Sequence, residues 1–308
     1  MTSYRNGVVV RVDSPTELRN PRTLDIDRMS TLDVLRAINV EDHVVPDAVA
    51  AVLPDVARAA DLAVLALRAG GRVHYVGAGT SGRLATLDAA ELPPTFNTPP
   101  DWFLAHHAGG QEALVRALEN VEDDDLGGAA QIRTHVTAGD LVLGVTASGR
   151  TPFVVGALRE ARAMGARTVL VSNNPVAPAP CEVDVLIALD TGPEAIAGST
   201  RMKAGSSQKL VLTSFSTAVM VRLGRTYSNL MVSMRATNAK LRGRTVRILR
   251  EATGLAEQEC TDALAGSGGD LKVALVHLLS GVPFARAAEA LVGSDGHVRQ
   301  ALVSLDDR

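Results

Sequence analysis

Two short loops rich in Gly, Ser and Thr carry the residues that could hold an anion. The first loop is GAGTSGR at residues 77–83, and the second is ASGRTP at residues 147–152. Each follows an apolar run typical of a strand and precedes a helical pattern, and Pro152 suits a first helical turn. Helix N-termini present free N–H groups, so two such loops can surround one phosphate, although Ser and Thr also cap helices that bind nothing. The candidate binding residues are Gly79, Thr80, Ser81, Ser148, Gly149 and Thr151.

The first loop also matches the dinucleotide-binding pattern G-x-G-x-x-G. A nucleotide site requires an acidic residue at the end of the second strand, about 20 residues on, and this chain has His106 and His107 there. A Walker A loop is excluded, because Gly82 is followed by Arg83 and Leu84 rather than by Lys and Ser or Thr. The loop therefore favours a phosphate over a nucleotide, and we expect no cofactor.

Two glutamates are candidates for proton transfer. Glu91 lies in DAAELPPT at the expected end of the helix that leaves the first loop. Because a proline disfavours helix in the residue before it, Pro93 and Pro94 predict a turn that holds Glu91 at a rigid corner near the anion site. Glu122 lies in ALENVEDDD at the expected end of the next helix, where an acidic run usually forms a solvated face. Two carboxyls in unequal environments can divide the roles of acid and base.

No other group of residues has the spacing of a catalytic or metal site. The chain lacks a Ser-His-Asp spacing, and its seven histidines are scattered apart from His106 and His107. We expect that pair to pack or form hydrogen bonds rather than bind a metal, so the predicted site contains no metal.

Strands and helices alternate from residue 73 onward, which is typical of a parallel sheet with helices on both faces. After Tyr227 the pattern shows no further strand, only short helices separated by Gly and Pro. The sequence thus predicts an α/β domain with an N-terminal helical arm over residues 1–240 and a small helical domain over 241–308. The expected strands are 73–76, 102–106, 140–146, 168–172 and 183–189. One helix is expected to begin near Ser30, and further helices are expected over 46–69, 110–121, 152–164 and 203–223.

Composition fits this architecture and excludes several classes of protein. Aromatic residues are only 3% of the chain and hydrophobic residues 46%, so Ala, Val and Leu must build the core. The net charge is −3 without a block of Lys and Arg, which argues against a nucleic-acid partner. No apolar run approaches the ~20 residues of a membrane span, and the charged N-terminus does not resemble a signal peptide. We expect a cytoplasmic protein without a membrane partner.

Four segments, taken in order, carry a family resemblance. GAGTSGRL, DAAELPPT, ASGRTPFV and GSTRMKAGSSQK closely resemble the N-acetylmuramic acid 6-phosphate etherases, which belong to the sugar-isomerase-type (SIS) phosphosugar-binding family. The match extends from about residue 15 to the C-terminus and includes a helical tail similar to a UBA domain. The two loops alone indicate a phosphosugar-binding domain, whereas ELPPT and GSTRMKAG are more specific to the etherases.

The resemblance implies cleavage of the D-lactyl ether of N-acetylmuramic acid 6-phosphate by elimination and then hydration. In this family's pattern Glu91 is the acid that protonates departing lactate, and Glu122 is the base. Arg201 or Lys203 pairs with the lactyl carboxylate, unless this segment is only a structural loop cap. The family is dimeric, with sites near the subunit interface. Ala90 departs from the pattern, since many relatives have Ser before the glutamate. The further residues expected to line the site are Ser199, Thr200, Arg201 and Lys203.

Two other functions remain as alternatives. A non-catalytic sugar-phosphate regulator, such as the glucokinase regulatory protein, would use the same loops, but such chains are longer and carry the sugar domain twice. An aldose–ketose isomerase would also need an aldehyde and a base at C2, but those enzymes lack the ELPPT and GSTRMKAG segments.

Overall fold

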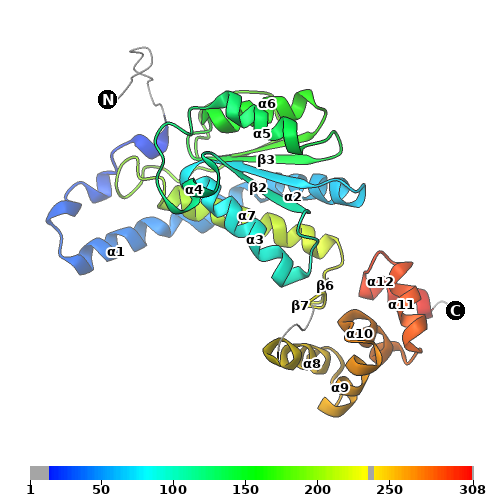
Figure 1. The fold of residues 1–308 in the computed structure, drawn as a ribbon. Coiled ribbons are helices and arrows are strands. Elements are labelled where there is room, and N and C mark those ends of the chain that lie inside the picture. The colour runs from blue at the N-terminus through cyan, green and yellow to red at the C-terminus, as the bar shows by residue number, and fades with distance from the viewer. Residues whose placement is uncertain (1–13, 235–238, 307–308) are drawn as a thin grey trace.

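A computed structural model describes residues 14–234 and 239–306 of the chain (Figure 1). Ser30 caps the first helix by accepting a hydrogen bond from the Asp33 N–H at 3.3 Å, and this confirms the start predicted from its residue type. Residues 1–13 of the predicted arm lie outside the described residues. The elements before the sheet are the 3₁₀ turns Pro15–Glu17, Pro21–Thr23 and Ile26–Arg28 and the helices α1 (Thr31–Asp42) and α2 (Val44–Arg68).

Five parallel strands form the central sheet in the order β2-β1-β3-β4-β5. Every pairing in this sheet is parallel, so the predicted parallel sheet and its five strands are confirmed. The strands are β1 (Val73–Gly77), β2 (Phe103–His107), β3 (Leu141–Thr146), β4 (Arg167–Ser172) and β5 (Val185–Ala188).

Helices cover both faces of the sheet (Figure 1). On one face, Val73 and Tyr75 pack with α2, α3 (Gly79–Phe96) and α7 (Lys203–Arg222). On the other face, Val76 packs with α5 (Asp125–His135) and α6 (Pro152–Ala163). Because successive side chains of a strand point to opposite faces, burial on both sides explains the nearly continuous apolar strands.

Helix α5 was not predicted, because its first residues were interpreted as part of a solvated acidic run. Asp124 caps this helix, since its carboxylate accepts the Gly127 N–H at 2.8 Å. A Cβ on Gly128 would lie 2.0 Å from the Phe153 carbonyl oxygen, so the glycine lets α5 pack directly on α6. Tertiary packing therefore decides this helix, although glycine has a low helix propensity.

The predicted corner at the two prolines is wrong, because α3 continues through Pro93 and Pro94 to Phe96. The helix ends at Asn97, whose φ is 51° and whose N–H donates to the Pro93 carbonyl at 2.9 Å. Each proline removes one helical hydrogen bond, and burial of Leu92 and Phe96 in the core offsets that cost.

Helix α4 (Gly110–Val115) ends before the predicted Val121. The Arg83 guanidinium donates to the carbonyls of Ala113, Leu114 and Arg116 at 2.6–3.0 Å, and so satisfies the end of the short helix.

The C-terminal region is helical, as predicted, and has a hydrophobic core of its own that includes Leu249, Leu275 and Ala287. A short antiparallel pair precedes it, β6 (Thr226–Tyr227) with β7 (Leu230–Met231), so the expectation of no strand after Tyr227 is wrong. Within the described ranges, no single helix is long and apolar enough to span a membrane, although α10 and α11 reach that length together as a pair bent by 111°. The helices are α8 (Ala239–Thr253), α9 (Glu257–Gly266), α10 (Leu271–Ser280), α11 (Phe284–Val292) and α12 (Val298–Asp306).

Candidate functional site

The two Gly/Ser/Thr loops leave the same edge of the sheet from adjacent strands. Gly77 at the end of β1 pairs with Val145 near the end of β3, so residues 78–81 and 147–151 begin side by side. The chain goes from β1 outward to β2 and then back to β3 on the other side, which makes this edge the point where the strand order reverses. Open α/β sheets bind ligands at such a point. The structure therefore brings the two predicted groups of binding residues together.

The first loop passes from strand to helix with almost no space between them. A Cβ on Gly82 would lie 2.7 Å from the Gly77 oxygen and 2.5 Å from the His107 ring, so only glycine allows this close approach. The Gly82 N–H makes the first helical hydrogen bond, to the Ala78 carbonyl at 3.1 Å. The preceding amides of Gly79 to Ser81 have no helical partner and are suited to an anion.

The His107 ring lies against the first loop, with both of its nitrogens close to backbone carbonyl oxygens. Its Nε2 lies 3.2 Å from the Gly79 carbonyl oxygen, and its Nδ1 lies 2.7 Å from that of Ala108. His106 Nε2 lies 3.0 Å from His74 Nδ1 in the interior. The prediction that this histidine pair packs or forms hydrogen bonds is confirmed.

The second loop gathers three hydroxyl groups. Thr146 Oγ1 lies 2.6 Å from Thr151 Oγ1 and 3.3 Å from Ser148 Oγ. Gly149 has a φ of +73°, and a Cβ there would lie 2.6 Å from the Ser172 hydroxyl. The chain thus needs glycine at this position to turn between β3 and α6.

Residues after β4, which were not among the predicted site residues, support the second loop. Asn174 Nδ2 donates to the Ser148 carbonyl at 3.3 Å, and the Asn174 N–H donates to the Ser172 hydroxyl at 3.0 Å. Two asparagines directly after a strand at the ligand edge of the sheet were the signal available in the sequence.

Glu122 lies beside the second loop, in the segment between α4 and α5 rather than at a helix end. Its carbonyl oxygen accepts the Phe153 N–H at 3.0 Å in the first turn of α6, and its side chain is exposed. This contact brings the Glu122 backbone close to Thr151, although 29 residues separate the two in sequence.

Glu91 lies far from the first loop of its own chain, so its expected place near the anion site is wrong within one subunit. It follows Thr80 by 11 residues in the continuous helix α3. At 1.5 Å per residue, the two positions are about 16 Å apart along the helix axis. Glu91 is exposed, and its neighbour Asp88 accepts hydrogen bonds from the Tyr75 and Ser216 hydroxyls at 2.9 and 3.0 Å.

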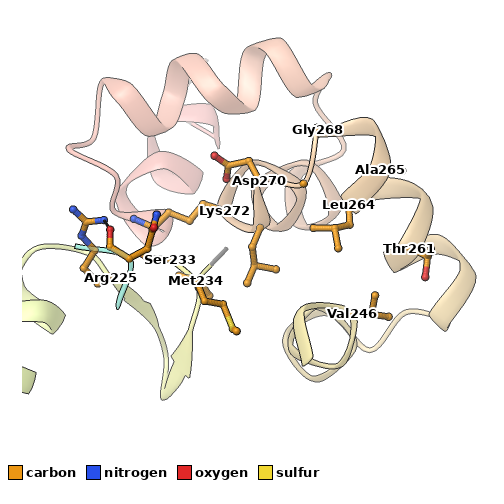
Figure 2. A pocket seen from close by; sticks show the side chains of 14 residues that line it. Arg225, Ser233, Met234, Val246, Thr261, Leu264, Ala265, Gly268, Asp270 and Lys272 are labelled. Atoms are coloured by element: carbon orange, nitrogen blue, oxygen red, sulfur yellow. Dashed lines mark hydrogen bonds between the residues drawn. The ribbon is translucent and has the colours of Figure 1, made fainter. Parts of the chain in front are cut away.

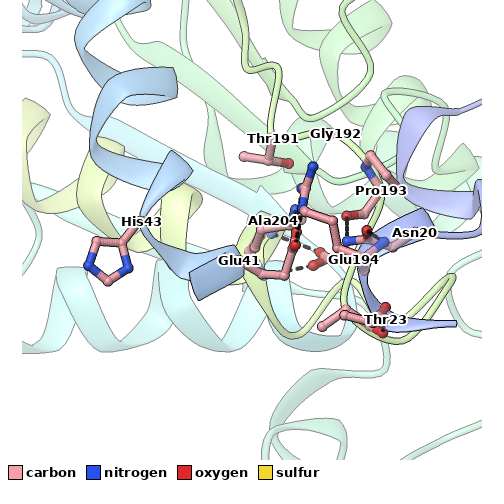
Figure 3. A network of polar contacts seen from close by, with 12 residues as sticks. Asn20, Thr23, Glu41, His43, Thr191, Gly192, Pro193, Glu194 and Ala204 are labelled. Atoms are coloured by element: carbon pink, nitrogen blue, oxygen red, sulfur yellow. Dashed lines mark hydrogen bonds and ion pairs between the residues drawn. The ribbon is translucent and has the colours of Figure 1, made fainter. Parts of the chain in front are cut away.

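Lys203 is committed to a buried network rather than to the loops, and Figure 3 shows its partners Glu41 and Glu194. Its Nζ lies 2.8 Å from Glu41 Oε2, and both side chains are only 1% exposed. Glu41 also pairs with Arg22, whose hydrogen bonds are the main cause that lowers the pKa of Glu41 to about 2. Glu194 accepts the N–H groups of Lys203 and Ala204 at 2.9 Å each and so caps α7. The expected role of Lys203 on a substrate carboxylate is therefore corrected to a structural one.

Arg201 does lie near the first loop. It lines a cleft of about 460 Å³ together with Thr80, Leu84 and Lys209. Ser199 and Thr200 form the turn before α7. The Met202 N–H donates to the Ser199 carbonyl there, and the Gly205 N–H donates to the Thr200 carbonyl. Lys209 was not assigned from the sequence, although it lies in the same GSTRMKAGSSQK segment, on the face of α7 that carries Gly205.

Curated relatives match most of the chain. The sequence is 62% identical over 269 residues to an N-acetylmuramic acid 6-phosphate etherase from Thermobifida fusca, covering 87% of this chain and 88% of the relative. It is 53% identical over 267 residues to an enzyme of the same name from Symbiobacterium thermophilum, covering 87% and 89%. Residues 55–162 match the family described as the glucokinase regulatory protein N-terminal SIS domain.

Solved structures share the fold at low sequence identity. A phosphoheptose isomerase from Francisella tularensis superposes with a TM-score of 0.52 at 20% identity, covering 63% of this chain and 100% of that one. The corresponding isomerase from Neisseria gonorrhoeae gives 0.50 at 18% identity, covering 62% and 99%. Together with the match of residues 55–162 to the SIS-domain family, these likenesses confirm the SIS-type fold that the resemblance implied.

Proposed function

The chain belongs to the family of N-acetylmuramic acid 6-phosphate etherases, and we propose that it converts N-acetylmuramic acid 6-phosphate and water into N-acetylglucosamine 6-phosphate and D-lactate. The observation that carries this function is 62% identity, over 87% of the chain, to an enzyme of that name. The reaction is a carbon–oxygen lyase step in the recovery of cell-wall sugars.

The reaction proceeds by elimination and then hydration. The sugar opens to its aldehyde, which acidifies the proton at C2. A base removes this proton, the C3–O bond breaks, and lactate takes a proton from an acid. Water then adds to the unsaturated aldehyde at C3. Proton transfers alone suffice for these steps, so the two carboxylates Glu91 and Glu122 supply the chemistry that is needed.

The two loops hold the phosphate. The free amides at the start of α3 and the hydroxyls of Thr80, Ser81, Ser148 and Thr151 converge at one edge of the sheet, and this supports their assignment. Gly79 and Gly149 have positive φ angles of 52° and 73°, which turn the backbone toward the ligand edge. The pairing of Gly77 with Val145 keeps both loops within reach of a single phosphate group.

The lactyl carboxylate pairs with Arg201 and Lys209. These two cations line the same cleft as Thr80, whereas the Lys203 ammonium is paired with Glu41. A carboxylate bound between a guanidinium and an ammonium makes charge-assisted hydrogen bonds, and these favour the acidic ether substrate over a neutral amino sugar.

Each site is shared between two copies of the chain in a homodimer. The axial distance of about 16 Å from Thr80 to Glu91 exceeds the span of a hexose phosphate from its phosphate to its C3 oxygen. Glu122, beside the second loop, acts as the base in its own subunit. Glu91 of the second copy acts as the acid.

Mixed dimers test this sharing. A Glu91→Gln subunit and a Ser148→Ala/Thr151→Val subunit are each inactive as homodimers. Random pairing gives one intact site in four if the acid comes from the partner, so the mixture regains about a quarter of the wild-type rate. A mixture that stays inactive, although the two variants exchange subunits, contradicts a shared site.

The protein acts in the cytoplasm, and its chain divides near residue 240 into the catalytic domain and a small helical domain. The separate core that includes Leu249 and Leu275 supports this division.

Release of D-lactate tests the function and separates it from the two alternatives. The purified protein is incubated with N-acetylmuramic acid 6-phosphate, and lactate is measured enzymatically. We expect release that is lost in Glu91→Gln and Glu122→Gln and kept in Glu119→Gln, a matched change at an exposed glutamate three residues away. Binding of the sugar phosphate without release of lactate would instead identify a regulator. Conversion of the sugar phosphate to a ketose would identify an isomerase.

A further inference from the structure

A large cavity lies away from the two loops, at the junction between the sheet domain and the helical region (Figure 2). Its volume is about 1020 Å³. One wall is formed by Asn97 and Arg225 and by residues 232–234, and the opposite wall by α8, α9 and the start of α10. None of the residues assigned to the phosphosugar site lines it.

Direct contacts beside the cavity connect the sheet domain and the helical region. The Arg299 guanidinium from α12 stacks 5.0 Å from the centre of the Tyr227 ring. Gly224 approaches His297 so closely that a Cβ there would come within 2.9 Å of the imidazole. These contacts join the two parts of the chain that line the cavity.

Two cations face this cavity from opposite walls. Arg225 stacks 4.8 Å from the Trp102 ring centre and donates to the Asn97 carbonyl at 3.3 Å. Lys272 on α10 extends toward Ser233 and Arg225 in Figure 2, and its Nζ donates to the Gly296 carbonyl at 2.9 Å. Burial and then the charge of Arg225 lower the pKa of Lys272 to about 8.

The carboxylate on the cavity wall does not balance these two charges. Among the described lining residues it is Asp270 alone, and its Oδ1 accepts the Val273 N–H at 3.0 Å as the cap of α10. Two like charges held together and partly removed from water are costly unless an anion joins them.

A hydroxyl group between the cations has no hydrogen-bond partner within the described part of the chain. Ser233 Oγ is buried, and Ser233 lines the cavity beside Arg225 and Lys272. A buried hydroxyl without a partner costs free energy, and a bound acceptor would satisfy it. The other side of the cavity is apolar, with Val246 and Leu264.

We propose that this junction cavity binds the phosphate group of a small metabolite between Arg225, Lys272 and the Ser233 hydroxyl. A phosphate dianion matches the two cations in charge and accepts the unpaired hydroxyl. The apolar wall contacts the organic part of the ligand. Because the ligand touches both the sheet domain and the helical region, its binding holds the two parts together. This site is separate from the phosphosugar loops and does not depend on the reaction that they serve.

Calorimetric titration with inorganic phosphate and with N-acetylglucosamine 6-phosphate tests the proposal. The starting protein carries Thr80→Val and Ser148→Ala, which weaken the loop site. We expect one remaining site per chain. Adding Lys272→Met should weaken it about tenfold or more, because a charge-assisted contact is lost. Adding Arg244→Met, at an exposed position on α8, should leave it unchanged.

Ser233→Ala is the second variant, since it removes a hydroxyl that forms no hydrogen bond within the described residues, and its loss should leave folding intact. It should also weaken the remaining site, with an unchanged melting temperature. The proposal is overturned if neither phosphate compound binds the loop variant, or if both Lys272→Met and Ser233→Ala leave the affinity unchanged.

Discussion

Replacement of Lys203 by Met removes the ammonium that neutralises Glu41 in the interior. Both side chains are 1% exposed, and 2.8 Å separates Nζ from Oε2. Removing one partner of a buried ion pair costs about 3–5 kcal/mol, because the other charge stays buried. Arg22, whose side chain is 57% exposed, still pairs with Glu41, so we expect the lower end of this range, about 3 kcal/mol.

Thermal unfolding measures this loss. At about 2–4 °C per kcal/mol for a domain of this size, Lys203→Met should lower the melting temperature by about 6–12 °C. Lys209→Met is the matched control, since Lys209 is exposed and lines the cleft with Thr80. It should leave the melting temperature unchanged and raise KM for the sugar phosphate.

The opposite pattern would refute the assignment of Lys203 to the interior. If Lys203→Met melts like the wild type but raises KM at least tenfold, its ammonium binds substrate and the network with Glu41 does not stabilise the fold. The double variant Glu41→Leu/Lys203→Met adds a check. It should recover part of the lost stability, because no unpaired charge remains buried.

Two further predictions concern the interior and the second loop. Burial lowers the pKa of His74 and His106 to about 4 in the folded protein. As the pH falls, these two histidines are therefore protonated at a higher pH in the unfolded chain than in the folded one. The free energy of unfolding should therefore decrease from about pH 6.5 to pH 4, by up to about 3 kcal/mol for each histidine. Urea unfolding at several pH values checks this, and a His74→Gln/His106→Gln variant with the same pH dependence as wild type would argue against it. Gly149→Ala should raise KM about tenfold or more, because its φ is +73° and its Cβ meets the Ser172 hydroxyl at 2.6 Å. Gly192→Ala, at a positive φ with open space around it, is the control, and an equal rise in KM there would contradict a specific role for Gly149.

Much of the fold could be predicted because its signals are local. Largely apolar runs of four to seven residues predicted the five strands, two of which end in the Gly/Ser/Thr loops, and glycines and prolines predicted the limits of the C-terminal helices. Helix α5 was not predicted, because it is stabilised by the contact of Gly128 with the Phe153 backbone, and no local sequence pattern indicates that contact. The corner at Pro93 was predicted wrongly because burial of Leu92 and Phe96 outweighs the local cost of proline.

The candidate site was predictable in part for the same reason. The two loops are recognisable from spacing, and adjacent parallel strands place them together. The surroundings of Lys203 could not be predicted from the sequence, because its partner Glu41 lies 162 residues away. The position of Glu91 depends on the uninterrupted length of α3, and that length followed from tertiary packing rather than from residue propensities.

Deuterium at C2 of the product sugar tests the central claim, elimination by a base at C2, most directly. The wild-type protein is incubated with N-acetylmuramic acid 6-phosphate in deuterated water, and the released N-acetylglucosamine 6-phosphate is examined by mass spectrometry and NMR. We predict one deuterium at C2 for each D-lactate released, and neither product from Glu122→Gln. Release of D-lactate with hydrogen retained at C2 would show that the ether is cleaved without proton removal there, and would contradict the account.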